Sequence, residues 1–190
     1  MGKIAITRPA DAYRLLNPGA VPLISVGDGS RDNLFPVTWN MPVRRDPGMV
    51  AILCGKAHFS YPIIEQTGEF GMNIPTADMA AAVLGCGRTS GRSVADKFKR
   101  FNLSRQPAER IRAPLVTEAP GNLECRVCQV VDLGTSALLI ATIIAARADE
   151  RHFRDGCWCF DHGLQLLHHL GGDRFALLTQ ELKVSAPAAS

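Results

Sequence analysis

The chain has 190 residues, a length that fits one domain with its own hydrophobic core. Apolar residues make up 46% and charged residues 21%, a balance that is typical of globular proteins and excludes a disordered chain. The formal net charge of +3 is too small to indicate a nucleic-acid partner, and it suits a protein that binds a small anion. The longest apolar run, residues 137–146, is too short to cross a bilayer, and no signal-peptide core follows Met1. We therefore expect a cytoplasmic protein with no membrane partner.

The first part of the chain alternates strand-like runs with turn residues. A short helix is predicted over residues 9–16, where Pro9 begins it and Asn17-Pro18-Gly19 ends it. Strands are predicted over residues 21–26, 34–41 and 49–54, with Asp46-Pro47-Gly48 as the turn between the last two.

Helices enter in the middle of the chain. The sequence predicts a helix over residues 61–67, with Ser60 as its N-cap and Gly68 at its end, and then a strand over residues 70–74. Thr76 is expected to cap an Ala-rich helix, and Ser93 with Asp96 resembles a capping box for a helix that carries Lys97.

Two long strands are predicted after a proline-punctuated loop. They span residues 123–133 and 137–147 and are joined by Gly134-Thr135-Ser136. Many strands, few helices and no regular βαβ alternation indicate a mainly β fold with flanking helices, built as a closed or partly closed antiparallel barrel. We expect one domain over residues 1–190, with a disordered tail at residues 183–190.

The segment with the clearest chemistry is residues 85–92, GCGRTSGR, followed by Asp96-Lys97-Phe98. Glycines allow backbone N–H groups to turn inward, hydroxyls donate hydrogen bonds, and arginine and lysine supply positive charge. The segment follows a helix-like stretch, whereas a dinucleotide-binding fingerprint follows a strand, and its lysine is misplaced for a P-loop. It therefore predicts a phosphate-binding turn of another fold.

The cysteine pairs indicate neither a metal centre nor a disulfide. A zinc site needs two knuckles on tight turns, but Cys125 and Cys128 fall in a predicted strand, where a spacing of three places them on opposite faces. We interpret them as inert thiols and predict no metal; Cys157 and Cys159, which flank Trp158, are slightly better placed for a redox or metal role.

Seven segments in order, over about residues 20–175, resemble the flavin reductase-like family of FMN-binding split barrels, and within it the flavoredoxins. The segments are Asn33-x5-Trp39, Cys54 to Tyr61 (CGKAHFSY), Phe70 to Pro75 (FGMNIP), Cys86 to Phe98, Ala113-Pro114-Leu115, Asn122 to Cys125 (NLEC) and Asp132-Leu133-Gly134.

This resemblance implies an antiparallel Greek-key split barrel that forms a homodimer with one non-covalent FMN per subunit. It suggests Asn33, Trp39, Ser60 and Lys97 as cofactor contacts. With the phosphate-turn residues and the backbone groups expected to face the flavin ring, the predicted cofactor-binding set is Asn33, Pro36, Val37, Thr38, Trp39, Lys56, Ala57, His58, Ser60, Ser90, Gly91, Arg92 and Lys97.

The four residues that the resemblance suggests as cofactor contacts also have simpler interpretations. Lys97 could be a solvated helix lysine, but a cation gains nothing from the helix dipole at an N-terminus, so a bound phosphate explains it better. Ser60 is a good N-cap in any protein. Trp39 could be a core or interface residue, and Asn33 a turn residue.

The leading functional hypothesis is an electron-transfer flavoprotein, in which bound FMN exchanges electrons with a redox partner protein or NAD(P)H. The alternative is an NAD(P)H:flavin oxidoreductase that releases reduced flavin to a partner. A more remote alternative is a non-redox module that binds another phosphate compound, such as pyridoxal phosphate. No Ser-His-Asp set or carboxylate pair is evident, so we predict no catalytic side chain.

Overall fold

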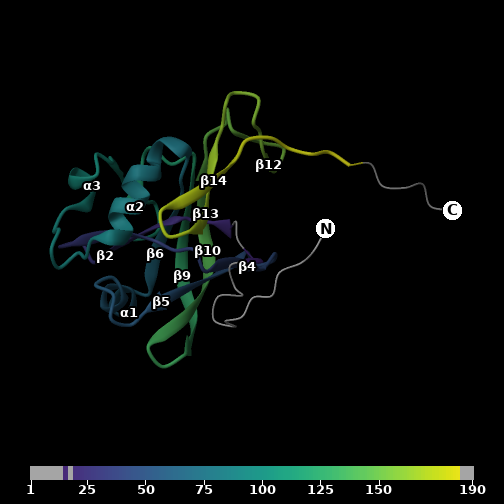
Figure 1. Ribbon diagram of the computed structural model, residues 1–190. Helices are drawn as coiled ribbons and strands as arrows, with labels where there is room; N and C mark the ends of the chain where they lie inside the picture. Colours follow the sequence, from purple (N-terminus) through teal and green to yellow (C-terminus); the bar gives the residue numbers. More distant parts are fainter. Residues whose placement is uncertain (1–14, 17–18, 185–190) are drawn as a thin grey trace, which may run out of the picture.

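The computed structural model describes residues 15–16 and 19–184, so almost all of the helix expected at residues 9–16 and most of the tail expected at 183–190 lie outside it. Seven strands form the main sheet in the order β3-β2-β6-β9-β10-β5-β4, and every neighbouring pair is antiparallel. The sheet curves into the predicted split barrel (Figure 1). Its strands are β2 (Leu23–Gly27), β3 (Asp32–Pro36), β4 (Asn40–Arg44), β5 (Met49–Gly55), β6 (Glu69–Ile74), β9 (Gly121–Asp132) and β10 (Ser136–Ala148).

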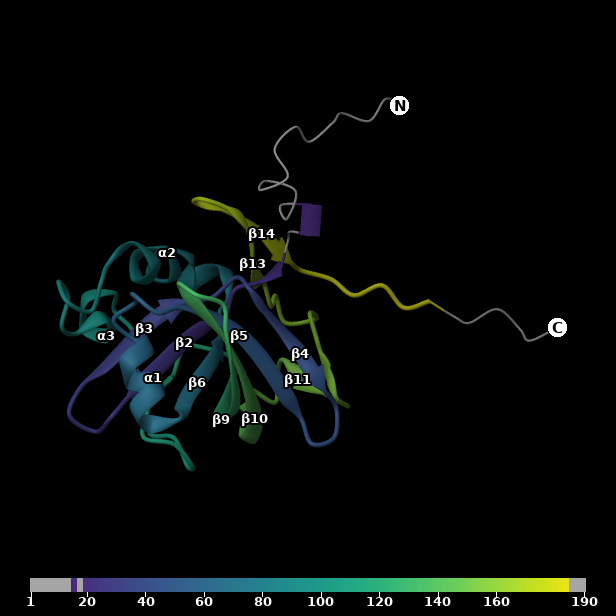
Figure 2. The ribbon, with the colours of Figure 1, turned by 90° about the horizontal axis from the view of Figure 1, so that it is seen from below.

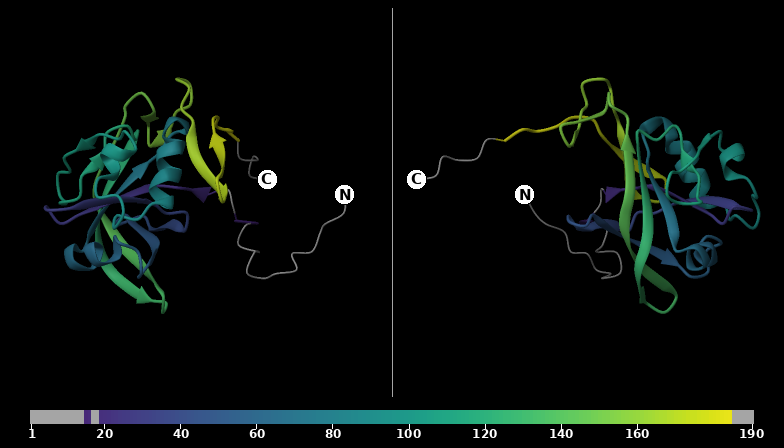
Figure 3. Two further views of the ribbon diagram at one scale, coloured as in Figure 1. Left: turned by 60° about the vertical axis from the view of Figure 1, so that its left-hand side comes forward. Right: turned by 180° about the vertical axis from the view of Figure 1, so that it is seen from behind.

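Helices lie at one side of this sheet, away from the edge strand β4 (Figure 2). They are α1 (Tyr61–Thr67), the 3₁₀ turn η2 (Ala77–Met79), α2 (Ala80–Arg88) and α3 (Lys97–Arg100). The β9–β10 pair is the longest ribbon of the molecule and runs through its full height (Figure 3).

Three small sheets complete the fold, and none of them was predicted from the sequence. One consists of β1 (Gly19–Ala20), β13 (Leu166–Gly171) and β14 (Arg174–Leu178). The other two are the pairs β7 (Arg105–Gln106) with β8 (Leu115–Val116), and β11 (Phe153–Arg154) with β12 (Cys157–Trp158).

The strands nearest the helices bury both faces. Ile24 and Phe35 belong to the cluster inside the curved sheet, which α1 closes with Ile63. Their chain neighbours Leu23 and Leu34 belong to a second cluster, with residues of α2, α3 and β13. Successive side chains of a strand point to opposite faces, so β2 and β3 separate the two cores. Helix α1 packs on one side of these strands, and α2 and α3 pack on the other.

Several local predictions are confirmed, and several are wrong. Gly68 ends α1 with φ 68° as expected, and the turn at residues 46–48 joins β4 to β5. The strand predicted over residues 34–41 is broken at residues 37–39, because the Val37 N–H donates to Pro22 O and the Trp39 carbonyl accepts from Leu53 N.

The predicted helix caps also need correction. Neither Ser60 nor Thr76 makes a side-chain cap hydrogen bond. At α3, Asp96 is itself the N-cap, and its carboxylate accepts from the Lys99 N–H at 2.9 Å, so Ser93 and Asp96 do not form a capping box. The Ser93 hydroxyl donates to Ser90 O instead.

A buried carboxylate fixes the loop before β8 to the barrel. Glu124 on β9 is 1% exposed and accepts hydrogen bonds from the Glu109 and Arg110 N–H groups and from Arg147 Nη2. Burial alone would raise the pKa of Glu124, but these donors outweigh it and hold the pKa below its ordinary value. The folded structure therefore favours the ionised form of Glu124.

Among the residues described, no helix is both long and apolar enough to cross a membrane.

Candidate functional site: a cavity beside the helices

A cavity of about 340 Å³ lies where β3, the start of α1, the end of α2 and the loop after α2 meet. Its volume is within the range of small-molecule sites, about 300–1,000 Å³. Nine of the thirteen predicted cofactor-binding residues line it. They are Asn33, Pro36, Ala57, His58, Ser60, Ser90, Gly91, Arg92 and Lys97.

Lys97 is the most unusual residue of this cavity. It is only 2% exposed, although it occupies the first position of the short helix α3, so it is not a solvated helix lysine. Its Nζ donates to Leu34 O of β3 at 2.7 Å and to Cys86 O of α2 at 2.8 Å. The ammonium group thus joins two walls of the cavity and retains one N–H.

No carboxylate pairs with Lys97 among the described residues. Burial lowers the pKa of Lys97, because removing the ammonium from water penalises its charged form. A buried cation without a countercharge is destabilising, and an anionic ligand would relieve it.

A second incomplete group is the amide of Asn33. Asn33 is 3% exposed, and its Nδ2 donates to Ser60 Oγ at 2.8 Å. Its Oδ1 is buried and has no partner among the described residues. Ser60 is therefore held by Asn33 rather than by the helix end that it precedes, and the pair offers the cavity one free acceptor.

The segment at residues 85–92 differs from the predicted phosphate turn in its first half. Helix α2 extends to Arg88, so Gly85 and Gly87 are helical. A Cβ at Gly85 would lie 2.3 Å from the ring of Phe101, and one at Gly87 would lie 2.9 Å from Pro36 Cγ. These glycines permit close packing of α2; only residues 89–92 form the turn at the cavity.

That turn holds its shape through local hydrogen bonds. The Ser90 hydroxyl accepts from the Arg92 N–H at 3.2 Å, and Ser90 O accepts from the N–H groups of Ser93 and Val94. The Arg92 guanidinium donates through Nη1 to Ala57 O at 3.2 Å. Arg92 thereby closes the cavity between the turn and the start of α1.

Gly91 sets how closely this turn approaches Phe59. We expect Gly91→Ala to lower stability by about 1–3 kcal/mol, because the new Cβ would lie 2.3 Å from Phe59 Cδ1 and the turn must move. Chemical denaturation measures the change. Gly19→Ala is the control, since nothing lies within 4 Å of a Cβ there. Equal stabilities of the two variants would contradict this packing.

The four remaining predicted residues lie outside the cavity. Val37 is buried, and its N–H is used by Pro22 O. Lys56 Nζ pairs with Asp132 at 2.7 Å, and its N–H donates to Thr135 O. Trp39 is 54% exposed and lines a different cavity beside β4, and Thr38 lines a cavity that adjoins the first.

This adjoining cavity has a volume of about 280 Å³ and shares Pro36, Gly87 and Arg88 with the first. Its other walls are mostly apolar, with His169 of β13 at one side. The Arg88 side chain reaches Asp173 at 3.6 Å and so joins α2 to the β13–β14 turn. The predicted cofactor-binding set leaves out six lining residues of the first cavity. Cys86, Gly87, Arg88 and Thr89 belong to the predicted phosphate-binding segment, whereas Phe35 and Phe59 lie inside the quoted motifs but were not singled out.

The cysteines are spread over the molecule. Cys125 is buried and Cys128 is exposed, as expected for opposite faces of a strand, but only the first is an enclosed thiol. Burial raises the pKa of the Cys86 thiol to about 11 and that of Cys125 to about 12. Within the described ranges, no cluster of three or more His, Cys, Asp or Glu residues could hold a metal ion.

The chain therefore combines a curved antiparallel barrel with a cavity beside its helices that Arg88, Arg92 and Lys97 help to line. The chain belongs to the flavin reductase like domain family, whose model matches residues 14–172. The uncharacterized protein YddH of Escherichia coli K12 is 34% identical over 169 residues, which cover 86% of this chain and 89% of YddH.

Solved structures confirm the fold. The flavoredoxin of Desulfovibrio vulgaris (Miyazaki F) has a TM-score of 0.84 at 24% identity, over 98% of this chain and 99% of that one. An FMN-binding domain of a flavin reductases-like enzyme from Shewanella baltica OS155 has a TM-score of 0.79 at 25% identity, over 96% of this chain and 98% of that one.

Proposed function

We propose that this protein is an electron-transfer flavoprotein that keeps FMN bound, non-covalently, in the cavity beside α2. Family membership supports a flavin ligand, and the residues present fit FMN in particular. When bound, FMN would supply redox chemistry that side chains do not provide. The single observation that carries the proposal is the buried ammonium of Lys97 at the cavity wall, which has no carboxylate partner among the described residues.

The phosphate end of FMN suits the side of the cavity formed by Lys97 and the 89–92 turn. The Lys97 ammonium and the Arg92 guanidinium would face the phosphate dianion there, and the Ser90 hydroxyl could donate a hydrogen bond. The short helix α3 is not needed as a phosphate site in itself, since the side chains supply the charge.

The remaining polar parts of FMN suit Asn33 and the wall formed by Pro36. Hydroxyls of the ribityl chain, or the ring N–H, could donate to the unpartnered Asn33 Oδ1. The N–H groups of Val37, Lys56 and His58 are already bonded to Pro22, Thr135 and Gly55. In that region, Thr38 and Ala57 are therefore the better backbone candidates for contacts with the ring.

A resident cofactor explains these groups better than a flavin that passes through as a substrate. Within the described part of the chain, the Lys97 charge has no countercharge and the Asn33 Oδ1 acceptor has no donor, and a bound flavin phosphate and hydroxyl or N–H group would supply both. Both are satisfied only while the ligand stays. This favours the electron carrier over the NAD(P)H:flavin oxidoreductase.

The test is the visible spectrum of the purified protein before and after gel filtration, followed by anaerobic addition of NADPH. We expect a yellow protein that retains about one FMN per chain, with slow oxidation of NADPH. Flavin lost on the column together with rapid NADPH oxidation would support the reductase instead. A colourless protein that does not bind added FMN would refute both.

We also propose that the protein forms a homodimer and that it exchanges electrons with a partner protein or NAD(P)H, as the family resemblance implies. The edge strand β4 supports association, since Met41 is 54% and Val43 is 42% exposed, and the adjacent Trp39 is 54% exposed. Apolar side chains on an unpaired edge strand are a common basis for pairing between chains.

A further inference from the structure

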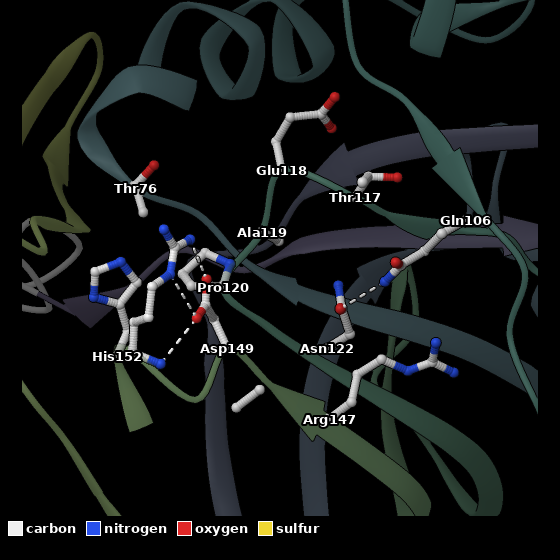
Figure 4. Close-up of a pocket in the computed structure, with 12 residues that line it drawn as sticks. Thr76, Gln106, Thr117, Glu118, Ala119, Pro120, Asn122, Arg147, Asp149 and His152 are labelled. Atoms are coloured by element: carbon white, nitrogen blue, oxygen red, sulfur yellow. Dashed lines mark hydrogen bonds and ion pairs between the residues drawn. The ribbon is translucent and has the colours of Figure 1, made fainter. Parts of the chain in front are cut away.

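A separate cavity, with a volume of about 500 Å³, lies between the start of β9, the end of β10 and the loop at residues 117–120 (Figure 4). It shares no lining residue with the flavin cavity or with the cavity adjoining it. We propose that this cavity binds a neutral cyclic amide, a compound with an N–H donor beside a carbonyl acceptor, as on the edge of a nucleobase. The proposal does not depend on the flavin site.

The first argument is a chain of buried amides whose direction is fixed. The Val116 N–H donates to Asn73 Oδ1 at 2.9 Å, and Asn73 Nδ2 donates to Leu23 O at 2.8 Å. A backbone N–H can only donate and a carbonyl can only accept, so these two bonds orient the amide of Asn73. Asn73 is fully buried, which leaves it no alternative partner in water.

The amide of Asn73 in turn orients the amide of Asn122, which contacts Gln106 at the cavity. Asn122 Nδ2 donates to Asn73 Oδ1 at 2.9 Å and to Val116 O at 3.1 Å, which turns Asn122 Oδ1 toward Gln106. Gln106 Nε2 donates to that oxygen at 2.9 Å (Figure 4). The Oε1 of Gln106 is thus left as an acceptor, and Gln106 lines the cavity.

The second argument is the state of Arg147, which lies on the same side of the cavity as Gln106 (Figure 4). Both of its ion pairs, with Glu109 at 3.4 Å and with Glu124 at 3.1 Å, use Nη2. Its Nε and Nη1 have no partner among the described residues. The two carboxylates already balance the charge of Arg147, so the remaining donors suit a neutral carbonyl better than an anion.

The other carboxylates at the cavity are also engaged. Both oxygens of Glu118 accept from the Ser104 N–H, and Asp149 pairs with Arg151 at 2.7 Å. His152 also lines the cavity, at the end away from Gln106, and its Nδ1 is buried without a partner in the described chain (Figure 4). Gln106 as acceptor and Arg147 as donor define a ligand that both donates and accepts.

Uracil is a suitable probe, and 1,3-dimethyluracil is its matched control because both of its N–H donors are removed. The experiment follows backbone amide NMR signals of the full chain with saturating FMN during a uracil titration. We expect saturable shifts at residues such as Gln106, Thr117 and Arg147. Binding of 1,3-dimethyluracil, or of uracil to Gln106→Leu, should be about twofold to tenfold weaker, since the hydrogen bond to Gln106 is lost in each case.

A second variant protects the test against a folding defect in Gln106→Leu. Ala148 is exposed and lines the cavity, so Ala148→Phe should fill it and abolish the shifts without disturbing the core. Three results would overturn the proposal: no saturable shift, equal affinity for uracil and 1,3-dimethyluracil, or shifts confined to residues of the flavin cavity. The last result matters because the flavin ring itself carries a uracil-like edge.

Discussion

Replacing Lys97 with methionine is expected to weaken FMN binding by roughly tenfold to a hundredfold. A charge-assisted hydrogen bond to a phosphate contributes about 1.5–3 kcal/mol, and methionine keeps the length of the side chain without its charge. The unfolding free energy of the FMN-free protein should change less, by about 1 kcal/mol or under. Loss of the bonds to Leu34 O and Cys86 O is offset by removal of a buried cation that no carboxylate of the described residues neutralises.

FMN fluorescence titration and chemical denaturation without FMN separate these two effects. Lys99→Met is the matched control, because Lys99 lies two residues further along α3 and is exposed. Lys99→Met should leave both quantities almost unchanged. Unchanged FMN affinity in Lys97→Met, with normal stability, would show that the phosphate is bound elsewhere.

The pH dependence of stability gives an independent signature of the same group. Burial lowers the pKa of Lys97 in the folded protein below 10.5, its ordinary value. Between the folded and unfolded pKa values the unfolded chain binds more protons, so stability without FMN should rise with pH in that window. Lys97→Met should lack this rise, and Lys99→Met should keep it.

Replacing Glu124 with alanine should cost about 3–5 kcal/mol of stability, because three donors lose a buried, charged acceptor. Glu109→Ala is the matched control. The Glu109 side chain is 68% exposed and contacts the same Arg147, and an exposed pair contributes only about 0–1 kcal/mol. Comparable losses in the two variants, measured by chemical denaturation, would contradict the central role of Glu124.

The sign of the pH effect at Glu124 is opposite to that at Lys97. The pKa of Glu124 is lowered on folding, so its stabilisation is complete above the ordinary value of 4.5 and is lost as the pH falls through the folded value. Glu124→Gln should therefore flatten the acid side of the stability curve.

Local signals in the sequence were sufficient for much of the barrel. Strand-like segments joined by Gly134-Thr135-Ser136 predicted the two long strands, and Gly68 and the turn at residues 46–48 are specified by backbone chemistry. The hairpin β13–β14 was missed, although Gly171 and Gly172, with φ 130° and 63°, are a hairpin signal in the sequence.

The failures arise where distant partners decide the outcome. The break at residues 37–39 depends on Pro22 and Leu53, and the helical glycines of α2 depend on Phe101 and Pro36. Motif spacing could place Lys97 near a phosphate, but its burial depends on carbonyls of β3 and α2 that no local pattern reveals. The orientation of Gln106 likewise depends on amides from three other segments.

A crystal structure of the protein with FMN tests the central claim most directly. The expected result is the FMN phosphate beside Lys97 Nζ and the 89–92 turn, with Asn33 Oδ1 accepting a hydrogen bond from the flavin. FMN bound elsewhere, with this cavity empty and Lys97 still held only by Leu34 and Cys86, would contradict it.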